Sequence, residues 1–239
     1  MKKALKKTFI IIGATIIFII LVLGYLGFMP GVSWLMGSAT PRDLGIKYTE
    51  KDLKSAYAKV NGNFIDLPAS SSPIDSLIFS GSANINSQLS NEEMTALANS
   101  GKWIYRPTKD VQIRVNNDGT VEASGILVKK NLAKMAEAYG YSGDDIKKMD
   151  NAIAAVPGNP RFYVKGTASI TNNNVNLNVQ EAEIGRINAK TIVSESQAES
   201  IIEQGIKHVP NANIRSASFG NGELKLDATL PSQLSRAVE

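Results

Sequence analysis

The chain has 239 residues, enough for one large domain or two small ones, and it contains no cysteine and a single histidine. Without cysteine it can form no disulfide and carry no lipid on an N-terminal cysteine, and the usual zinc sites and cysteine–histidine nucleophiles are excluded. Lysine and arginine number 26 against 22 aspartates and glutamates, and four lysines fall within the first seven residues, so the remainder is neutral. We expect no nucleic-acid partner, because binding along a phosphate backbone needs a concentrated basic surface.

The first element is an uncharged, mostly apolar stretch of 21 residues from Thr8 to Phe28. As a helix it would be about 30 Å long, which matches the hydrocarbon core of a bilayer. The sequence favours a membrane span (residues 8–28) over a cleaved secretory signal, whose apolar stretch is about 7–15 residues long, although the small residues at 37–39 would suit a peptidase. Lysines precede the span, so we expect a single-pass protein of the cytoplasmic membrane with its N-terminus inside and its main domain outside.

Three segments are expected along the chain. They are a cytoplasmic basic tip and transmembrane helix over residues 1–29, a connector with one short helix over residues 30–75, and an external domain over residues 76–239. The connector helix is predicted from Thr49 and Asp52, which suit a capping box before apolar residues at helical spacing. After this helix the connector is rich in proline and serine and is expected to be a loop.

The external domain begins with strict alternation over residues 77–89, which predicts one long, half-buried strand that bends at Gly81. A full capping box over residues 90–93 predicts a helix that ends near residue 101. A hairpin is predicted next, because alternating residues lie on both sides of an Asp-Gly pair at 118–119.

Helical spacing over residues 132–156 predicts two helices with a break between them. Two alternating strands are predicted over residues 161–184, and their apolar phase slips near Gln180, which indicates a bulge. A helix capped by Ser194 or Ser196 is predicted next, and its apolar residues form a stripe at helical spacing. A last hairpin with an Asn-Gly turn follows it.

The order strand, serine-capped helix, hairpin occurs over residues 77–128 and again over residues 161–230, so the sequence predicts two related units. Strands with one apolar face must be covered, and helices supply part of that cover. The expected fold class is therefore α+β, with an N-terminal transmembrane helix and an external domain of long, curved antiparallel strands wrapped on helices.

Small residues recur at the middle of the predicted strands, on their apolar faces. They let another body approach the sheet closely, and that body is either a helix of the same chain or an acyl chain lying in a seam between sheet and helix. A helix of the same chain is the more usual occupant, and the expected membrane span adds weight to the acyl chain, because it holds the domain beside a reservoir of lipid. The candidate ligand-binding residues of this apolar seam are Phe79, Ala83, Ile85, Phe162, Val164, Ala168 and Leu177.

Two stretches carry a resemblance to a known family. SQLSNEEMTALAN before the hairpin DVQIRVNNDGTVEASG, and FYVKGTASITNNNVNLNVQEAEIGRI before a serine-capped helix, resemble the YpmS-like single-span envelope proteins of unknown function. The resemblance covers residues 76–230. It implies a tubular lipid-binding (TULIP-like) type of fold, in which a strongly curved sheet embraces a helix, and it brings no catalytic residue with it.

Residues suited to catalysis are scarce. The acidic pairs at 92–93 and 144–145 lie at predicted helix starts, where carboxylates are explained by capping, and His208 lies at a predicted helix end, where a cation suits the dipole. Loops that bind nucleotide phosphates or calcium are not recognisable in the sequence. We therefore expect no enzyme, catalytic residue, cofactor or metal, and a membrane-anchored envelope protein that binds or transfers lipid. The alternative is a module that binds or assembles with another envelope protein, and a hydrolase using the acidic pairs is a third hypothesis.

Overall fold

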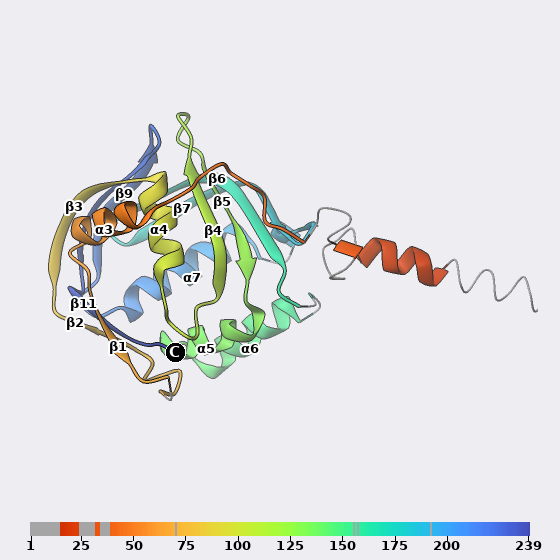
Figure 1. Ribbon diagram of the computed structural model, residues 1–239, viewed down its shortest axis with the longest axis horizontal. Helices are drawn as coiled ribbons and strands as arrows, with labels where there is room; N and C mark the ends of the chain where they lie inside the picture. Colours follow the sequence, from red (N-terminus) through yellow and green to blue (C-terminus); the bar gives the residue numbers. More distant parts are fainter. Residues whose placement is uncertain are drawn as a thin grey trace, which may run out of the picture.

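The structure, a computed structural model, describes residues 15–23, 32–33, 39–69, 71–154, 156, 158–191 and 193–239. Of the expected membrane span, residues 15–23 form a helix, and residues 8–14 and 24–28 lie outside the described part. Figure 1 shows this helix to one side of the folded body. None of the described helices is both long and apolar enough to cross a membrane.

The fold is mixed α+β with mostly sheet, which confirms the predicted class. The large sheet has the strand order β3 (Ala83–Ser90), β10 (Glu223–Leu230), β9 (Asn213–Gly220), β6 (Arg161–Thr171), β5 (Val121–Leu127), β4 (Thr108–Val115). Strand β7 (Asn174–Ile184) pairs with β6, and the short β8 (Ile187–Asn188) pairs with β7. A smaller sheet has the order β1 (Asn63–Leu67), β11 (Gln233–Ala237), β2 (Leu77–Ser80).

Strand β6 joins the two halves of the large sheet. One of its edges pairs with β7, and its other edge pairs with two strands in succession, with β5 at residues 161–166 and with β9 at residues 169–171. The hairpins β4–β5 and β9–β10 therefore leave the same strand edge. Their tips lie side by side, with Gly119 next to the backbone of Phe219, and Figure 1 shows both at the top of the view.

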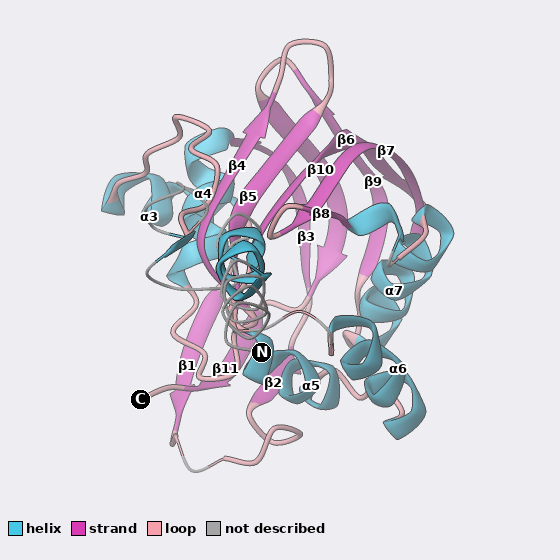
Figure 2. Ribbon diagram, turned by 90° about the vertical axis from the view of Figure 1, so that its right-hand side faces the viewer, coloured by secondary structure: helices cyan, strands magenta, loops and turns pink. Residues whose placement is uncertain are grey.

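Helix starts follow the capping signals of the sequence. Capping boxes begin α3 (Glu50–Lys59), α4 (Asn91–Ser100) and α7 (Glu195–His208), with Thr49, Ser90 and Ser194 as the N-cap residues. The two helices predicted over residues 132–156 are α5 (Lys129–Ala138) and α6 (Gly143–Ile153), and a short 3-10 helix (Ala189–Thr191) precedes α7. Figure 2 shows α5, α6 and α7 grouped on one side of the strands. The helices predicted within residues 49–209 are thus confirmed, whereas the predicted transmembrane helix has no support among the described residues.

The strand prediction is wrong in three places. The predicted long strand over residues 77–89 is two strands, β2 in the small sheet and β3 in the large one. The predicted bend at Gly81 is confirmed, because this residue has φ +69° and a side chain there would overlap the hydroxyl of Ser232. The segment expected to be a loop contains β1, and β11 follows the last predicted hairpin. Strand β1 is also parallel to β11, an exception to the antiparallel prediction.

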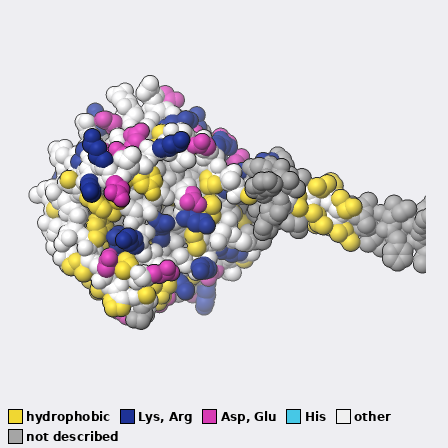
Figure 3. Space-filling view, in the orientation of Figure 1, with side chains coloured by type: hydrophobic (Ala, Val, Ile, Leu, Met, Phe, Trp, Pro, Cys, Tyr) yellow, Lys and Arg dark blue, Asp and Glu magenta, His cyan; other side chains and the backbone are white. Residues whose placement is uncertain are grey.

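The packed core lies between α3, α4 and the strands beside them. Its buried members are Ala56, Leu89, Met94 and Val115, and partly buried residues such as Phe219 and Leu224 pack against them. On the face shown in Figure 3, acidic and basic side chains are mixed rather than gathered by sign.

Helix α4 covers the outer edge of β4 with polar side chains. The side-chain oxygens of Asn91, Thr95 and Asn99 accept hydrogen bonds from the backbone N–H groups of Val115, Ile113 and Val111, at 2.7, 3.0 and 2.9 Å. Thr95 and Asn99 also donate to the carbonyl oxygens of the same strand residues. These side chains replace a neighbouring strand, which protects the edge from pairing with another chain.

Candidate functional site

An apolar groove with a volume of about 330 Å³ lies between strands β5, β6, β7 and helix α7. We call it the groove. Its strand side includes Val121, Ala123, Val164, Ala168, Leu177 and Val179, and its helix side includes Ala198 and Ile202. The residues on the strand side are intermediate in exposure rather than buried. The inner face of the sheet is therefore not filled here by the chain's own side chains.

Strand register and one bulge place these residues on a common face. Ala123 lies opposite Val164, and Ala168 lies opposite Leu177. Lys165 pairs with Glu181 whereas the next residue, Gly166, pairs with Val179, so Gln180 is an extra residue in β7. This confirms the bulge predicted near Gln180. The extra residue shifts the alternation along β7: Leu177 and Val179, with odd numbers, face the groove before the bulge, and Ala182, with an even number, faces it after the bulge.

Gly166 is required beside this bulge. A Cβ atom built at Gly166 would overlap the backbone carbonyl oxygen of Asn178 and lie 3.0 Å from the Cα atom of Val179. Both contacts are with backbone, which cannot move aside as the end of a flexible side chain can. The small residues that the sequence shows at mid-strand thus have two roles, because Ala168 leaves room in the groove and Gly166 allows close approach of β7.

Helix α7 is held along the edge of β7 by three carboxylates. Glu195, Glu199 and Glu203 accept hydrogen bonds from the backbone N–H groups of Val179, Leu177 and Val175, at 3.0, 2.8 and 3.0 Å. Four residues of helix rise about 6 Å and two residues of strand about 6.6 Å, so successive carboxylates reach alternate N–H groups of an antiparallel strand. We call these three residues the glutamate ladder.

The apolar stripe of α7 is not buried. None of its residues, all of which the structure describes, is buried, and Ile201 and Ile202 are 43% and 41% exposed. The physical reason is that the glutamate ladder attaches the helix to the edge of the sheet, so the helix does not press its apolar stripe against a sheet face. Ala198 and Ile202 of that stripe border the groove instead; its other members are Ile201, Ile206 and Val209.

The structure brings together some of the predicted seam residues and separates others. Val164, Ala168 and Leu177 line the groove. Phe162 is on β6, like Val164 and Ala168, but its ring occupies the space that a side chain on Gly125 would need. Phe79, Ala83 and Ile85 lie on β2 and β3, apart from the residues that line the groove. Ile85 is 1% exposed, opposite Ala228, Ala83 pairs with Leu230, and Phe79 lies 6.0 Å from Tyr139, measured between ring centroids.

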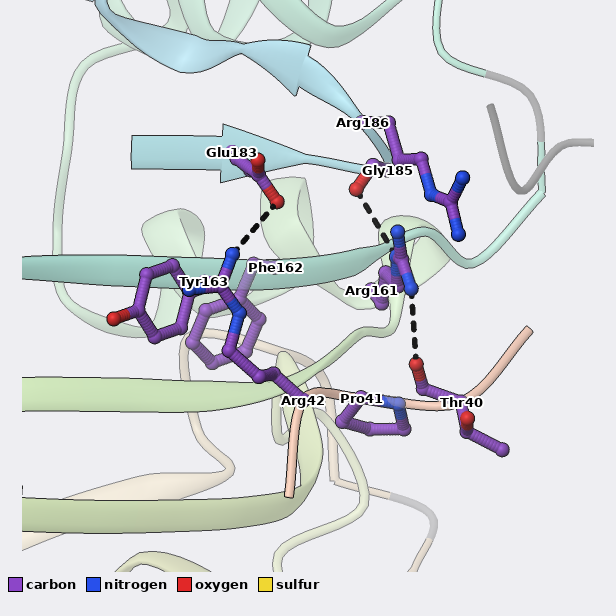
Figure 4. A pocket seen from close by; sticks show the side chains of 9 residues that line it. All are labelled: Thr40, Pro41, Arg42, Arg161, Phe162, Tyr163, Glu183, Gly185 and Arg186. Carbon is purple, nitrogen blue, oxygen red and sulfur yellow. Dashed lines mark hydrogen bonds and ion pairs between the residues drawn. The ribbon is translucent and has the colours of Figure 1, made fainter. Parts of the chain in front are cut away.

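A second, polar cavity of about 470 Å³ lies where the connector meets the end of β7 (Figure 4). We call it the arginine pocket, because its lining includes Arg42, Arg161 and Arg186, together with Thr40, Tyr163 and Glu183. The guanidinium of Arg42 lies 3.4 Å from the ring centroid of Tyr163 and donates to Glu181 and Glu183, at 2.9 and 3.5 Å. The sequence analysis missed this pocket, since its arginines are scattered along the chain.

A buried carboxylate supports the wall of the arginine pocket. Glu122 accepts hydrogen bonds from Tyr163 at 2.7 Å, Arg114 at 2.7 Å and Asn116 at 2.9 Å. Burial opposes ionisation of Glu122, but these hydrogen bonds and the charge of Arg114 outweigh it and lower the pKa of this carboxyl to about 2. Burial and the bond to Glu122 raise the pKa of the Tyr163 hydroxyl to about 12. A carboxylate that stays ionised and has three donors fixes the position of Tyr163.

The acidic pairs lie in the first turns of helices, as predicted. Glu93 accepts from the backbone N–H of Ser90, and Asp145 accepts from the hydroxyl of Ser142. His208 is the last residue of α7 and lies 5.0 Å from Tyr141, measured between ring centroids. Within the described part of the chain, histidine, aspartate and glutamate form no group of three that could hold a metal ion.

Comparison with known proteins gives no match. No family model matches the chain, and no curated protein or solved structure is significantly similar to it. The resemblance to YpmS-like proteins therefore stays a prediction.

Proposed function

We propose that the protein is an externally facing, single-pass cell-envelope protein that binds or transfers lipid without catalysis. The observation that carries the proposal is the groove, whose strand and helix walls are both apolar and both partly exposed. Pockets for small molecules are concave and mostly apolar, and exposed apolar surface in a concave site is favourable to cover. An apolar chain is the occupant that fits such walls.

The size of the groove sets what it can hold. At roughly 30 Å³ for each small group, the share of volume that a water molecule has in the liquid, about 330 Å³ accommodates about ten methylene groups. Each fully buried methylene contributes about 0.8 kcal/mol, and an open groove buries one side of the chain, so we estimate roughly 4–8 kcal/mol before the costs of association. This range suits reversible binding, which a transfer protein needs.

Membrane anchorage is proposed from the sequence and from the exposed surface of the N-terminal helix. Residues 8–28 carry no charge. In the described part of this stretch, apolar side chains are exposed around the helix, among them Ile17 at 59% and Phe18 at 66%. A helix that is apolar on all sides is stable when it is surrounded by apolar material, and lipid supplies that material. The leading lysines favour an N-terminus inside and the main domain outside.

The proposal of two related units is supported by the helices α4 and α7. Each begins after a serine N-cap, and each bonds to alternate backbone N–H groups of an edge strand through residues spaced by four. In both cases helix and strand run antiparallel. The two units differ in one respect: α4 covers β4, which follows it in the chain, whereas α7 covers β7, which precedes it.

The lipid proposal is tested with the full chain extracted in an uncharged detergent and analysed by native mass spectrometry. We expect a lipid to co-purify with the wild type. Ala168→Trp places an indole in the groove, and we expect at least a fivefold fall in retained lipid. The control is Asn176→Trp, which adds the same ring to the opposite, exposed face of β7. A stable wild type without lipid, or equal retention by both variants, would contradict the proposal.

The alternative, a protein-interaction or assembly module, is favoured by one surface. Ile65 and Ile78 are 42% and 49% exposed and lie on either side of Ser235, in one row across the small sheet. Photo-crosslinking from position 78 in whole cells tests it. Capture of one defined envelope protein, lost in Ile65→Lys and retained in Ala168→Trp, would favour the module over the lipid binder.

A further inference from the structure

The outer edge of β1 has no cover among the described residues. Helix α4 covers the edge of β4, and the glutamate ladder covers the edge of β7. In the small sheet, β2 lies beside α5, since the ring centroid of Phe79 is 6.0 Å from that of Tyr139, the C-cap residue of this helix. Figure 2 shows β1 at the margin of the small sheet that faces away from α5. An uncovered strand edge is a template for pairing with another chain.

The register of β1 determines which backbone groups point outward. Strand β1 is parallel to β11, and the N–H of Asn63 and the C=O of Leu67 bond to the residues flanking β11. Successive residues of a strand direct their backbone groups to opposite edges, so those of Phe64 and Asp66 point away from β11. None of the described residues bonds to the N–H or C=O groups of these two residues. The side chains here are open to solvent, with Ile65 42% and that of Asp66 56% exposed.

These outward groups are complementary to those of a second β1 strand. In an antiparallel pair centred on Ile65, Phe64 of each copy lies opposite Asp66 of the other, and each such pair exchanges two hydrogen bonds. Centring on Asp66 would place two carboxylates opposite each other and would bring Pro68, which has no N–H, opposite Phe64. Centring on Phe64 would require Gly62, whose N–H is already bonded to α3 at 3.1 Å. One register therefore suits both copies.

The side chains support the same register. On one face, Ile65 of each copy would lie against Ile65 of the other, which continues the exposed row of Ile65 and Ile78 into the second copy. On the other face, Asp66 would lie opposite Phe64 of the second copy. The guanidinium of Arg236 lies 4.5 Å from the ring centroid of Phe64, and its buried Nε atom has no hydrogen-bond partner. The pairing thus brings a carboxylate of each copy toward a guanidinium of the other.

We propose that the protein forms a homodimer in which the β1 strands of two copies pair antiparallel about Ile65, so that the two small sheets become one. This inference goes beyond the proposed function and depends on neither the groove nor lipid. Two strands of five residues bury less than the about 1,200 Å² typical of stable complexes, so the dimer is weak and reversible. Anchorage of both copies in one membrane, as proposed above, would favour it by raising their effective concentration.

The chain contains no cysteine, so a single introduced cysteine reports on the pairing. Opposite residues that exchange no hydrogen bonds have Cα atoms about 4.5 Å apart, which a disulfide can bridge. On mild oxidation of the full chain in an uncharged detergent, Ile65→Cys should give about ten times as much disulfide dimer as Ile78→Cys. Ile78 is the matched control, because it is 49% exposed but five strand spacings of about 4.8 Å, or roughly 24 Å, would separate its two copies.

A pair of charges at position 65 tests the symmetry of the dimer without a covalent bond. Like charges directly opposite each other in a sheet are destabilising. Ile65→Lys and Ile65→Glu should each lower the dimer fraction about tenfold, measured by sedimentation at a concentration at which the wild type is half dimeric. An equal mixture of the two variants should dimerise again, because opposite charges then meet. Ala168→Trp, which changes the groove, should dimerise as the wild type does.

Equal disulfide formation by Ile65→Cys and Ile78→Cys would indicate random collision and overturn the proposal. A wild type that stays monomeric at about 1 mM, or a mixture of the two charged variants that stays monomeric, would also overturn it. In whole cells, a disulfide from Ile65→Cys to a different protein and none to itself would assign the edge to that protein instead of a second copy. Lipid retention is measured separately, so failure of the dimer leaves the proposed function standing, and the reverse holds as well.

Discussion

Removing the glutamate ladder should detach α7 from the edge of β7. Hydrogen bonds to charged groups contribute about 1.5–3 kcal/mol when they are buried. The side chain of Glu195 is 41% exposed, and water can reach the strand amides when the carboxylates leave, so we take about 1 kcal/mol for each bond. Replacing Glu195, Glu199 and Glu203 by alanine then costs about 3 kcal/mol of local stability. Alanine is the best helix former, so the changes do not lower the intrinsic helix propensity of the segment.

The assay is amide hydrogen exchange on the full chain. At about 1.4 kcal/mol for each factor of ten, the triple variant should exchange the amide hydrogens of Val175, Leu177 and Val179 about 100-fold faster, and Glu199→Ala alone should accelerate Leu177 about fivefold. Gln204→Ala changes an exposed residue of the same helix and should leave these rates unaltered. Unchanged exchange at Leu177 in the triple variant would refute the view that the carboxylates hold the helix.

Two further predictions concern residues of the large sheet. The pKa of Glu122 is lowered from 4.5 to about 2, so its stabilising effect is present above pH 4.5 and is lost as pH falls toward 2. The shift corresponds to about 3 kcal/mol, which we reduce to about 1–2 kcal/mol because Arg114 is 40% exposed and screened. Glu122→Gln should therefore unfold at lower temperature at pH 7 and show a flatter decline below pH 4.5, whereas parallel pH curves would contradict this. Gly166→Ala should lower the free energy of unfolding, measured by thermal unfolding, by about 2–4 kcal/mol, because its Cβ atom would overlap the backbone of β7. A Cβ atom at Gly220 meets no atom within 4 Å, so Gly220→Ala should lower it by less than about 1 kcal/mol. Equal losses in the two variants would show that the close approach of β7 to Gly166 does not determine the cost.

Local signals in the sequence predicted local structure well. The capping boxes at Thr49 and Ser90 each fix a helix start, because their hydrogen bonds join residues three apart in the chain. The bulge at Gln180 appears as a slip in alternation, since an extra residue reverses which side chains face the core. Gly81 marks a bend because it tolerates a positive φ.

Non-local pairing could not be predicted in the same way. Strand β1 has five residues, and its partner β11 lies about 170 positions later in the chain, so no turn signal connects them. The division of residues 77–89 between two sheets is likewise decided by partners, β11 for the first part and β10 for the second. A sequence pattern reports which face of a strand is apolar, but it does not name the strand beside it.

Only some of the residues that line the groove could be predicted, because alternation shows which face of a strand is apolar but not what covers that face. Val164, Ala168 and Leu177 were found because alternation places them on one face of adjacent strands. Ile85 has the same alternation, yet it lies in a packed region with 1% exposure. Helix α7 carries an apolar stripe and a stripe of glutamates spaced by four, and the sequence cannot say which of them docks.

The chemistry of the two edge helices indicates which wall of the groove can open. On α4, Thr95 and Asn99 both donate to and accept from β4, so they satisfy the N–H and the C=O groups of their strand residues, and Thr95 is 1% exposed. Carboxylates only accept, so the glutamate ladder satisfies the N–H groups of β7 and leaves its carbonyls to other partners. With fewer bonds to each strand residue and no buried side chain, α7 is the more weakly held of the two. Since α7 also borders the groove, it is the wall that a lipid entering from the side would displace.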